Sequence, residues 1–152
     1  MSLEKILPQL EALKKSGKKI ISTNGCFDIL HRGHVNYLQA ARSLGDILIV
    51  GINSDASVKK LKGDGRPLNK AEDRAYVLSA LRCVDFVFTF NEDLPVEFLK
   101  KIKPHTHVKG GDYVAHKLPE YETLKSFGAE IAIIPFVWGY STTQLLELVR
   151  KS

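Results

Sequence analysis

Apolar residues recur at helical spacing at the start of the chain. They are Leu3, Ile6, Leu7, Leu10 and Leu13, and the basic pair Lys14-Lys15 follows them. Gly17 comes next, and glycine commonly ends a helix because it readily adopts the left-handed conformation. The pattern predicts an N-terminal amphipathic helix over residues 1–17, ahead of a larger domain over residues 18–152.

Five apolar runs follow, and the best of them, Ile47 to Ile52 and Ile131 to Ile134, have the length of a strand rather than of a membrane span. The five runs lie near residues 19–22, 46–53, 84–90, 107–108 and 130–135, and helical patterns separate them. Strands that alternate with helices are typical of parallel strands joined by crossover helices. The pattern predicts an α/β fold, a Rossmann-like parallel sheet with helices on both faces.

Between Val58 and Leu68 the apolar pattern gives way to lysines, glycines and a proline, which is typical of a mobile loop. Asn69 follows with Glu72 three residues later, a spacing that favours a capped helix start. The apolar face of that helix would hold Val77, Leu78 and Leu81.

A chain of 152 residues suits one domain with a sizeable core. Its 22 Lys and Arg exceed its 17 Asp and Glu, and the resulting net charge of +5 favours anionic ligands. The basic residues are scattered without interleaved aromatics, which favours a nucleotide over nucleic acid. Two cysteines, Cys26 and Cys83, form neither a disulfide framework nor a metal knuckle. We expect a cytoplasmic protein that binds neither membranes nor nucleic acid.

The segment from Thr23 to His34 joins a predicted strand to a helix start and reads Thr-Asn-Gly-Cys-Phe-Asp-Ile-Leu-His-Arg-Gly-His. Gly25 permits a tight turn, and His31 and His34 share one face of a helix that begins near His31. The first N–H groups and the dipole of such a helix attract anions. Gly33 lets a phosphate approach the backbone between the two histidines. The segment therefore predicts a triphosphate site.

A zinc site is the other interpretation of the two histidines, because a spacing of three on a helix can bridge a metal. Zinc would need a further well-spaced ligand, and the remaining histidines, His105, His107 and His116, lie in unrelated segments. Phosphate binding also accounts for the glycine and for the strand-to-helix position. We therefore favour phosphate and expect no direct metal ligation by side chains.

These residues resemble the signature of the HxGH nucleotidyltransferases, a family that includes cytidylyltransferases and small adenylyltransferases. Three further blocks fall in that family's order: Glu72-Asp73-Arg74, Arg82-Cys83-Val84-Asp85-Phe86-Val87 and Ser141-Thr142-Thr143. A narrower likeness, to the adenylyltransferases that make ADP-heptose for lipopolysaccharide, comes from Thr23-Asn24-Gly25, Asn53-Ser54-Asp55-Ala56-Ser57, Leu61-Lys62-Gly63-Asp64, Arg66-Pro67 and Val108-Lys109-Gly110-Gly111-Asp112-Tyr113.

The resemblance implies an enzyme that transfers AMP from ATP to D-glycero-β-D-manno-heptose 1-phosphate and releases pyrophosphate. It implies Mg²⁺ with the ATP, in-line displacement without a phosphohistidine, a separate sugar kinase in the pathway and a homodimer. The block over residues 82–87 would contribute to the dimer contact, although an ordinary helix-to-strand junction explains it equally. A glycerol-3-phosphate cytidylyltransferase and a non-catalytic nucleotide sensor are the alternatives. The stretch from Phe136 to Gly139 lacks the arginine that cytidylyltransferases carry there, which counts against CTP.

The resemblance also assigns the candidate site. His31 and His34 would stabilise charge on the α-phosphate, and Lys62 or Lys59 would close over it from the glycine-bounded loop. We prefer Lys62 slightly because it adjoins Gly63. The nucleotide would contact Asn24, Gly25, Cys26, Phe27, Gly33, Lys109, Gly110, Gly111, Asp112, Ser141, Thr142 and Thr143.

Several of these residues also have a purely structural interpretation. Arg74 is either a phosphate contact or the partner of a neighbouring acid in its helix, and Arg66 is a weaker candidate for the acceptor phosphate. Asp28 either forms a turn or faces the acceptor's hydroxyls. Lys109 to Asp112 would make a simple glycine turn. Ser141 with Gln144 forms a capping box, which is compatible with binding the β- and γ-phosphates.

Overall fold

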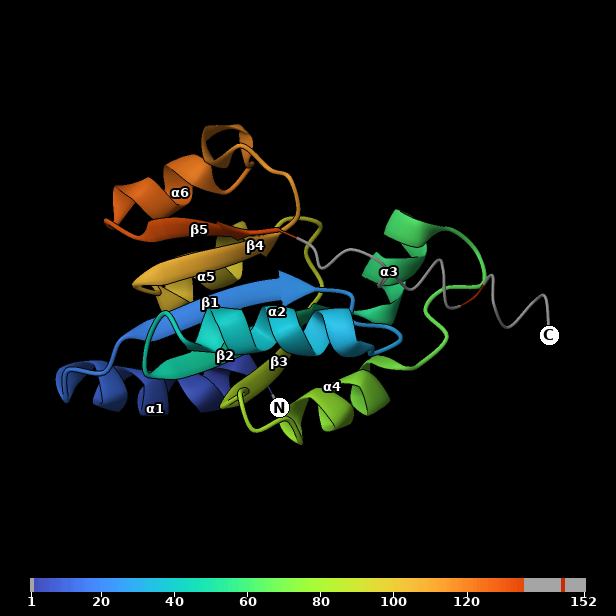
Figure 1. The fold of residues 1–152 in the computed structure, drawn as a ribbon, viewed down its shortest axis with the longest axis horizontal. Helices are drawn as coiled ribbons and strands as arrows, with labels where there is room; N and C mark the ends of the chain where they lie inside the picture. The colour runs from blue at the N-terminus through green and yellow to red at the C-terminus, as the bar shows by residue number, and fades with distance from the viewer. Residues whose placement is uncertain (1, 136–145, 147–152) are drawn as a thin grey trace.

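The sheet at the centre of the molecule has five strands, all parallel (Figure 1). The structure is a computed structural model and describes residues 2–135 and 146. The strands are β1 (Ile20–Gly25), β2 (Ile47–Asn53), β3 (Phe86–Phe90), β4 (Thr106–Gly110) and β5 (Glu130–Ile134). The helices are α1 (Leu3–Lys15), α2 (Arg32–Arg42), α3 (Asp55–Lys62), α4 (Ala71–Ser79), α5 (Val96–Ile102) and α6 (Tyr121–Ser126), with a short 3-10 turn η1 (Ala115–Lys117).

The strand order β3-β2-β1-β4-β5 reverses direction at β1. The chain moves outward from β1 through β2 to β3 and then returns to place β4 on the other side of β1. Thr23 lies opposite Val50 of β2 and opposite Val108 of β4. In open parallel sheets, ligands bind at the carboxyl ends of the strands where the order reverses, which here is the β1–β4 seam. The predicted α/β, Rossmann-like fold is confirmed.

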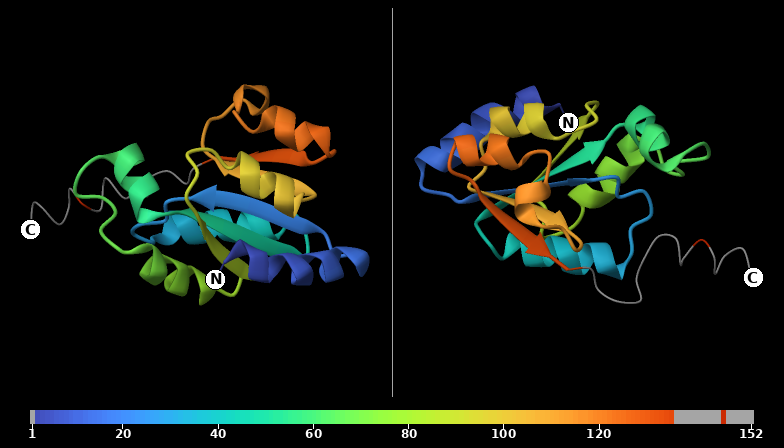
Figure 2. Two further views of the ribbon diagram at one scale, coloured as in Figure 1. Left: turned by 180° about the vertical axis from the view of Figure 1, so that it is seen from behind. Right: turned by 90° about the horizontal axis from the view of Figure 1, so that it is seen from above.

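Helices cover both faces of the sheet, and each face has its own hydrophobic cluster. Figure 1 shows α2 in front of the sheet, and Figure 2 shows α1 and α5 on the opposite side. The α2 face buries Ile21, Leu38, Ala41, Leu48, Val50, Ile52, Leu78 and Val108. The other face buries Ile6, Leu10, Ile20, Ile49, Phe88, Phe98, Leu99, Ile102 and Leu124.

The predicted N-terminal helix is present as α1 and ends ahead of Gly17, whose φ is +81°. Its Ile6 and Leu10 are fully buried in the cluster that contains Ile20 of β1 and Phe98 of α5. This helix therefore packs on the same face of the sheet as α5, and the domain boundary at residue 17 stays a prediction.

The loop predicted from Val58 to Leu68 is wrong in its first half. Helix α3 continues to Lys62 because Ser54 caps its start through a bond from the Ser57 N–H and Val58 is fully buried. The irregular segment begins at Gly63, where φ is +91°. Tertiary burial outweighs the polar composition there.

The predicted cap at Asn69 is also wrong, because α4 begins two residues later and has Lys70 at its N-cap position without a side-chain bond. The Asn69 Nδ2 instead donates to the carbonyl of Asp28 at 2.6 Å. The predicted apolar face holds for Leu78, which is fully buried, but Val77 is 49% exposed. No helix among the described residues is long and apolar enough to cross a membrane.

Candidate active site

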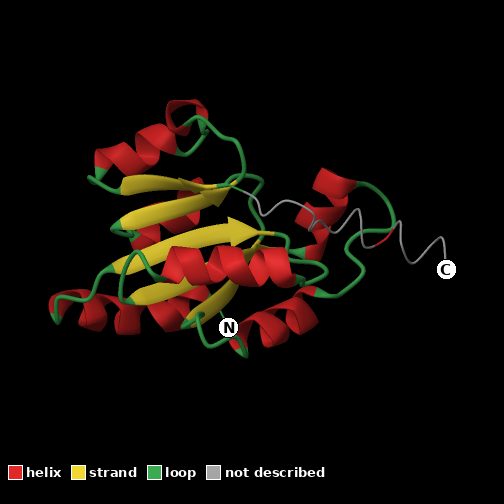
Figure 3. Ribbon diagram, viewed as in Figure 1, coloured by secondary structure: helices red, strands yellow, loops and turns green. Residues whose placement is uncertain are grey.

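Of the candidate residues that the structure describes, most lie at or beyond the carboxyl ends of β1, β2 and β4. In Figure 3 the strand arrowheads point toward the side of the molecule where α3 and the loop after it lie. The turn after β1 carries the segment up to His31, and α3 follows directly on β2. The fold therefore brings the histidine segment and the lysines of α3 to the same edge of the sheet.

His31 is the N-cap of α2, with an extended φ of −143°. Its Nδ1 accepts a hydrogen bond from the backbone N–H of Gly33 at 3.1 Å. A neutral imidazole with an accepting Nδ1 carries its proton on Nε2. The cap therefore fixes the His31 tautomer and leaves Nε2–H as a donor.

His34 stacks on His31, with ring centroids 3.9 Å apart and an angle of 31° between the planes. Burial, with the nearby His31 as a second cause, lowers the pKa of His34 to about 4, and burial also lowers the pKa of His31. Both rings are therefore neutral at pH 7 and can donate one N–H each. The Nδ1 of His34 is buried and has no hydrogen-bond partner among residues 2–135 and 146.

Phe27 shapes the turn that leads to the histidines. Its φ of +47° is rare for a residue with a side chain, and its buried ring meets the edge of the His34 ring at a centroid distance of 5.4 Å. A Cβ at Gly25 would lie 3.0 Å from the Phe27 ring. Gly25 is therefore needed because the Phe27 side chain folds back over it, and Phe27 supports His34.

Arg74 is buried and ties four segments together. Its guanidinium donates to the carbonyls of Asn69 at 3.0 Å, Cys26 at 2.6 Å and Asn53 at 2.9 Å, and it pairs with the Asp55 carboxylate at 2.7 Å. An ion pair with a neighbouring acid of its own helix is therefore the wrong interpretation. The Arg74 side chain is 0% exposed, so it anchors the turn after β1 to the start of α3. The phosphate contact implied by the resemblance stays a prediction.

Asp28 holds the segment that precedes α4. Its carboxylate accepts hydrogen bonds from the backbone N–H groups of Leu68 and Asn69, both at 2.9 Å, and pairs with Arg66 at 2.6 Å. Burial alone would raise the pKa of Asp28, but these two hydrogen bonds and the Arg66 charge outweigh it and lower the pKa. These contacts reach 38 to 41 residues along the chain, so the Asp28 carboxylate joins distant segments and orients Arg66, and they are not the local contacts of the predicted turn. Contact of either side chain with an acceptor stays a prediction.

The two candidate lysines differ in their surroundings. Lys59 pairs with Asp64 at 3.2 Å, whereas Lys62 lies at the end of α3 and its charge acts on the thiol of Cys26. Burial raises the pKa of that thiol, and the positive charges of Lys62 and Arg74 only partly offset the effect. Cys26 is therefore a packing residue in its thiol form, and Lys62 is an α3 lysine whose charge reaches the turn after β1.

The glycine turn predicted over residues 109–112 is wrong in its first half, because β4 continues through Lys109 to Gly110 and the chain leaves the strand only at Gly111. Lys109 donates to the Asn24 Oδ1 at 3.0 Å, which links the ends of the two adjacent strands. Gly111 has a φ of +125° and donates its N–H to the carbonyl of Ile134 at 2.9 Å, and Asp112 beside it is exposed. Gly110 is the last residue of β4, so the turn reaches the same edge of the sheet as Asn24 and Gly25. The candidates Ser141, Thr142 and Thr143 lie outside the described residues.

Sequence reasoning missed Glu120 and the buried state of His107. Glu120 is 1% exposed and pairs with Lys109 at 2.8 Å, and His107 is 0% exposed. A lone glutamate in a polar stretch carries no signal of burial. His107 stands beside Val108 in a short run predicted to be a strand, and this is the one sign that it faces the interior.

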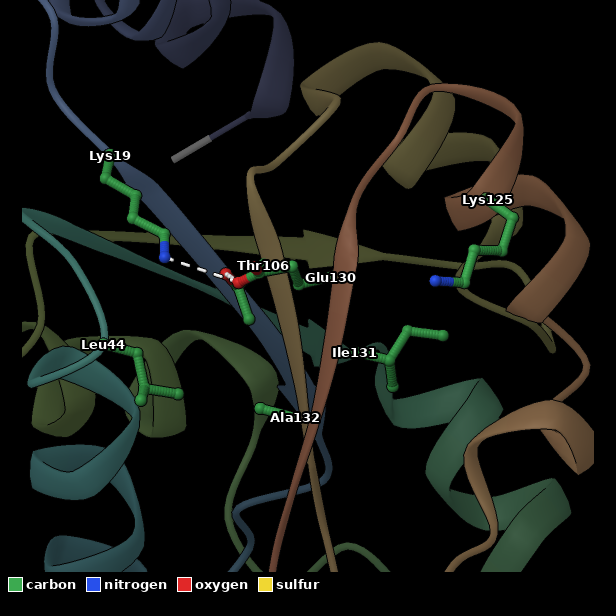
Figure 4. A pocket seen from close by; sticks show the side chains of 7 residues that line it. All are labelled: Lys19, Leu44, Thr106, Lys125, Glu130, Ile131 and Ala132. Atoms are coloured by element: carbon green, nitrogen blue, oxygen red, sulfur yellow. Dashed lines mark hydrogen bonds and ion pairs between the residues drawn. The ribbon is translucent and has the colours of Figure 1, made fainter.

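A hollow of about 340 Å³ lies at the opposite edge of the sheet (Figure 4). It is lined by residues at or just before the amino ends of three strands, by a residue of the turn after α2 and by side chains of α6 and β5: Lys19, Leu44, Thr106, Lys125, Glu130, Ile131 and Ala132. The histidines lie past the carboxyl ends, so this hollow is separate from the candidate site. Within residues 2–135 and 146, no group of three or more His, Cys, Asp or Glu is placed to hold a metal ion.

The sequence profile of cytidylyltransferase-like proteins matches residues 22–147. The chain belongs to the cytidylyltransferase-like family. The resemblance to the HxGH nucleotidyltransferases is thereby confirmed, and the matched range includes every candidate site residue from Asn24 to Thr143.

Individual relatives of this cytidylyltransferase-like chain are proteins named "Bifunctional protein HldE". That of Sulfurimonas denitrificans is 53% identical over 97% of this chain and 30% of its own length, and that of Helicobacter pylori is 49% identical over 97% and 32%. The chain thus spans about three tenths of the curated relatives it matches. The crystal structure of the lipopolysaccharide core biosynthesis protein from Thermoplasma volcanium is similar with a TM-score of 0.65 and 27% identity, over 80% of this chain and 98% of that one.

Proposed function

We propose that this chain transfers AMP from ATP to D-glycero-β-D-manno-heptose 1-phosphate and releases ADP-heptose and pyrophosphate. One observation carries the proposal: two neutral imidazoles, His31 and His34, stack at the start of α2 beside the reversal point of the sheet. Family membership supports nucleotidyl transfer. The similarity to the lipopolysaccharide core biosynthesis protein of Thermoplasma volcanium supports a sugar nucleotide as the product.

The two rings suit the charge that develops during the reaction. As a phosphate oxygen of the acceptor attacks the α-phosphorus of ATP, negative charge builds on its equatorial oxygens while pyrophosphate departs. The fixed His31 tautomer offers Nε2–H to such an oxygen, and the α2 N-terminus adds its dipole. One preorganised donor of this kind lowers a barrier by about 3 kcal/mol. Because the rings are neutral, they can stabilise the charge without transferring a proton.

Mg²⁺ would accompany the ATP. The described residues offer no cluster of three ligating side chains, so phosphate oxygens and water would supply most of the oxygen ligands that Mg²⁺ requires. The ion would supply charge neutralisation for the departing pyrophosphate. Residues of the chain would orient the phosphates, among them Lys62 of α3, whose charge reaches the turn after β1.

A nucleotide panel tests the proposal. ATP, CTP, GTP and UTP are each combined with heptose 1-phosphate and with glycerol 3-phosphate, and pyrophosphate release is measured. Turnover with ATP and heptose 1-phosphate alone supports the proposal. Turnover with CTP and glycerol 3-phosphate would instead make the chain a glycerol-3-phosphate cytidylyltransferase, and nucleotide binding without any turnover would make it a sensor.

Three further features belong to the same proposal. A homodimer would bury the exposed side chains of Tyr76 and Val77 on α4, which precedes the block over residues 82–87. ATP as substrate and the free thiols of Cys26 and Cys83 suit a reducing cytoplasm. A sugar kinase would supply the acceptor. The relatives, which are named bifunctional, extend well beyond the part that this chain matches.

A further inference from the structure

A row of polar side chains crosses the interior between the sheet and the η1–α6 segment. Ser22 and Asn24 of β1 lie on the same face as His107 and Lys109 of β4, because side chains two residues apart on a strand share a face. Glu120 reaches the row from the residue before α6. The row runs toward the carboxyl end of β1, where the candidate site begins.

Glu120 is the charged centre of this row. Its Oε1 lies 2.8 Å from the Lys109 Nζ and 3.7 Å from the His107 Nε2, and its side chain is 1% exposed. The Nδ1 of His107 lies 2.7 Å from the Ser22 Oγ, and complete burial holds the pKa of His107 well below its usual value. His107 is therefore neutral, and Lys109 is the cation that balances the buried carboxylate.

Lys109 in turn fixes the orientation of the Asn24 amide. Its Nζ donates to the Asn24 Oδ1 at 3.0 Å. An ammonium group has donors and no acceptor, so the oxygen of the amide must face Lys109 and the NH₂ group must face away from it. The Asn24 NH₂ can therefore donate only to a partner other than Lys109. Asn24 immediately precedes Gly25 at the end of β1, so this donor lies where the candidate site begins.

We propose that Glu120 is a positioning residue for nucleotide binding: it holds Lys109 so that the Asn24 amide NH₂ faces the nucleotide. The ligand atom that this NH₂ takes is a hydrogen-bond acceptor, either an oxygen of the ribose or phosphates or a ring nitrogen of the base. Glu120 acts only through Lys109 and Asn24 and touches no substrate. The inference rests on the proposed function for the nature of the ligand.

The first test replaces Glu120 by Gln and measures the KM for ATP, kcat and the unfolding temperature. A hydrogen bond that involves a charged group contributes about 1.5–3 kcal/mol. Loss of the Asn24 contact with ATP should therefore raise the KM for ATP about tenfold or more, with kcat changed less than about twofold. Glu97→Gln is the matched control, because Glu97 forms an exposed pair with Lys100, also at 2.8 Å. Its KM should equal that of the unaltered protein. An unchanged or lower KM in Glu120→Gln overturns the inference.

Two further variants separate positioning from folding. The double variant Lys109→Met with Glu120→Gln removes both buried charges and should recover stability, because no uncompensated charge remains. Its KM for ATP should stay high. A return to the KM of the unaltered protein would show that Glu120 only neutralises the charge of Lys109, and this would overturn the inference. Asn24→Asp keeps an oxygen toward Lys109 but loses the NH₂ donor, so we expect ATP binding to weaken at least about tenfold.

Calorimetric binding of ATP in the absence of acceptor distinguishes this inference from the proposed function. If the unaltered protein binds ATP without turnover, the proposed function fails. The ratio of the Kd for ATP of Glu120→Gln to that of the unaltered protein still decides the role of Glu120. If the unaltered protein turns over ATP and Glu120→Gln binds it equally well, only the present inference fails.

Discussion

The rings of His31 and His34 are stacked with their centroids 3.9 Å apart. Two positive charges at that separation would repel each other strongly, and burial already disfavours the charged form of each ring. The pair is therefore built to work uncharged. This arrangement leads to two predictions, one on turnover and one on pH.

Replacing His34 by Ala should lower kcat about a hundredfold, because one preorganised donor to the α-phosphate is lost. Steady-state pyrophosphate release measures the effect, and ATP affinity should change much less. His116→Ala is the control, since His116 is exposed on η1. Equal losses in the two variants would contradict a role of His34 in the transition state.

The pH dependence of stability should show the depressed pKa of His34. The folded pKa is about 4 and the usual value is 6.5, so the unfolded chain binds the proton more readily between these limits. The contribution of His34 to stability is therefore complete above pH 6.5 and is lost as the pH falls toward 4. Urea unfolding at pH 7 and pH 5 should show a smaller drop in His34→Asn than in the unaltered protein. Equal drops would show that His34 titrates normally in the folded state.

Replacing Arg74 by Met should destabilise the fold by about 3 kcal/mol or more, because three backbone carbonyls, that of Asn53 in a buried bond, and the Asp55 carboxylate lose their buried donor. Denaturant unfolding measures the change. The exposed Arg82, replaced by Met, should cost less than about 0.5 kcal/mol. A stable Arg74→Met protein with weak ATP binding would instead favour the direct phosphate contact that the family resemblance implies.

Of the lysines of α3, Lys62 should matter most for turnover. Lys62→Met should lower kcat at least about tenfold, since it removes a cation whose charge reaches the turn after β1. Lys59 and Lys60 are engaged with Asp64 and Asp93, and their Met variants should retain most activity. A larger loss in Lys59→Met than in Lys62→Met would reverse this assignment.

The sequence predicted the elements whose pattern is set locally. The strand-length apolar runs became the five strands, and the spacing of Leu3, Ile6 and Leu10 became the buried face of α1. The segment with His31 and His34 was found because a turn, a helix start and two histidines lie within twelve residues. Each of these signals depends on neighbours in the chain.

The errors come from contacts between distant segments. Asn69 resembles a helix cap, but its amide is taken by the Asp28 carbonyl, which is 41 residues away. Arg74 looks like a surface arginine of an amphipathic helix until Cys26 and Asn53 supply its partners. Glu120 lacks any local sign of burial. It lies in a polar stretch, and its partner Lys109 is on a strand eleven residues earlier, so the residues next to Glu120 do not indicate the pair.

The pairing of β1 with β4 also has a consequence for the order in which parts of the protein can fold during synthesis. Asn24 and Lys109 are 85 residues apart, and loop closure over such a span is entropically costly and slow. During synthesis, β1 and β2 can leave the ribosome and associate before β4, which forms the other side of the candidate site, has been translated. A nascent chain that stalls before Glu120 should therefore protect the α2 segment from proteolysis yet fail to retain ATP.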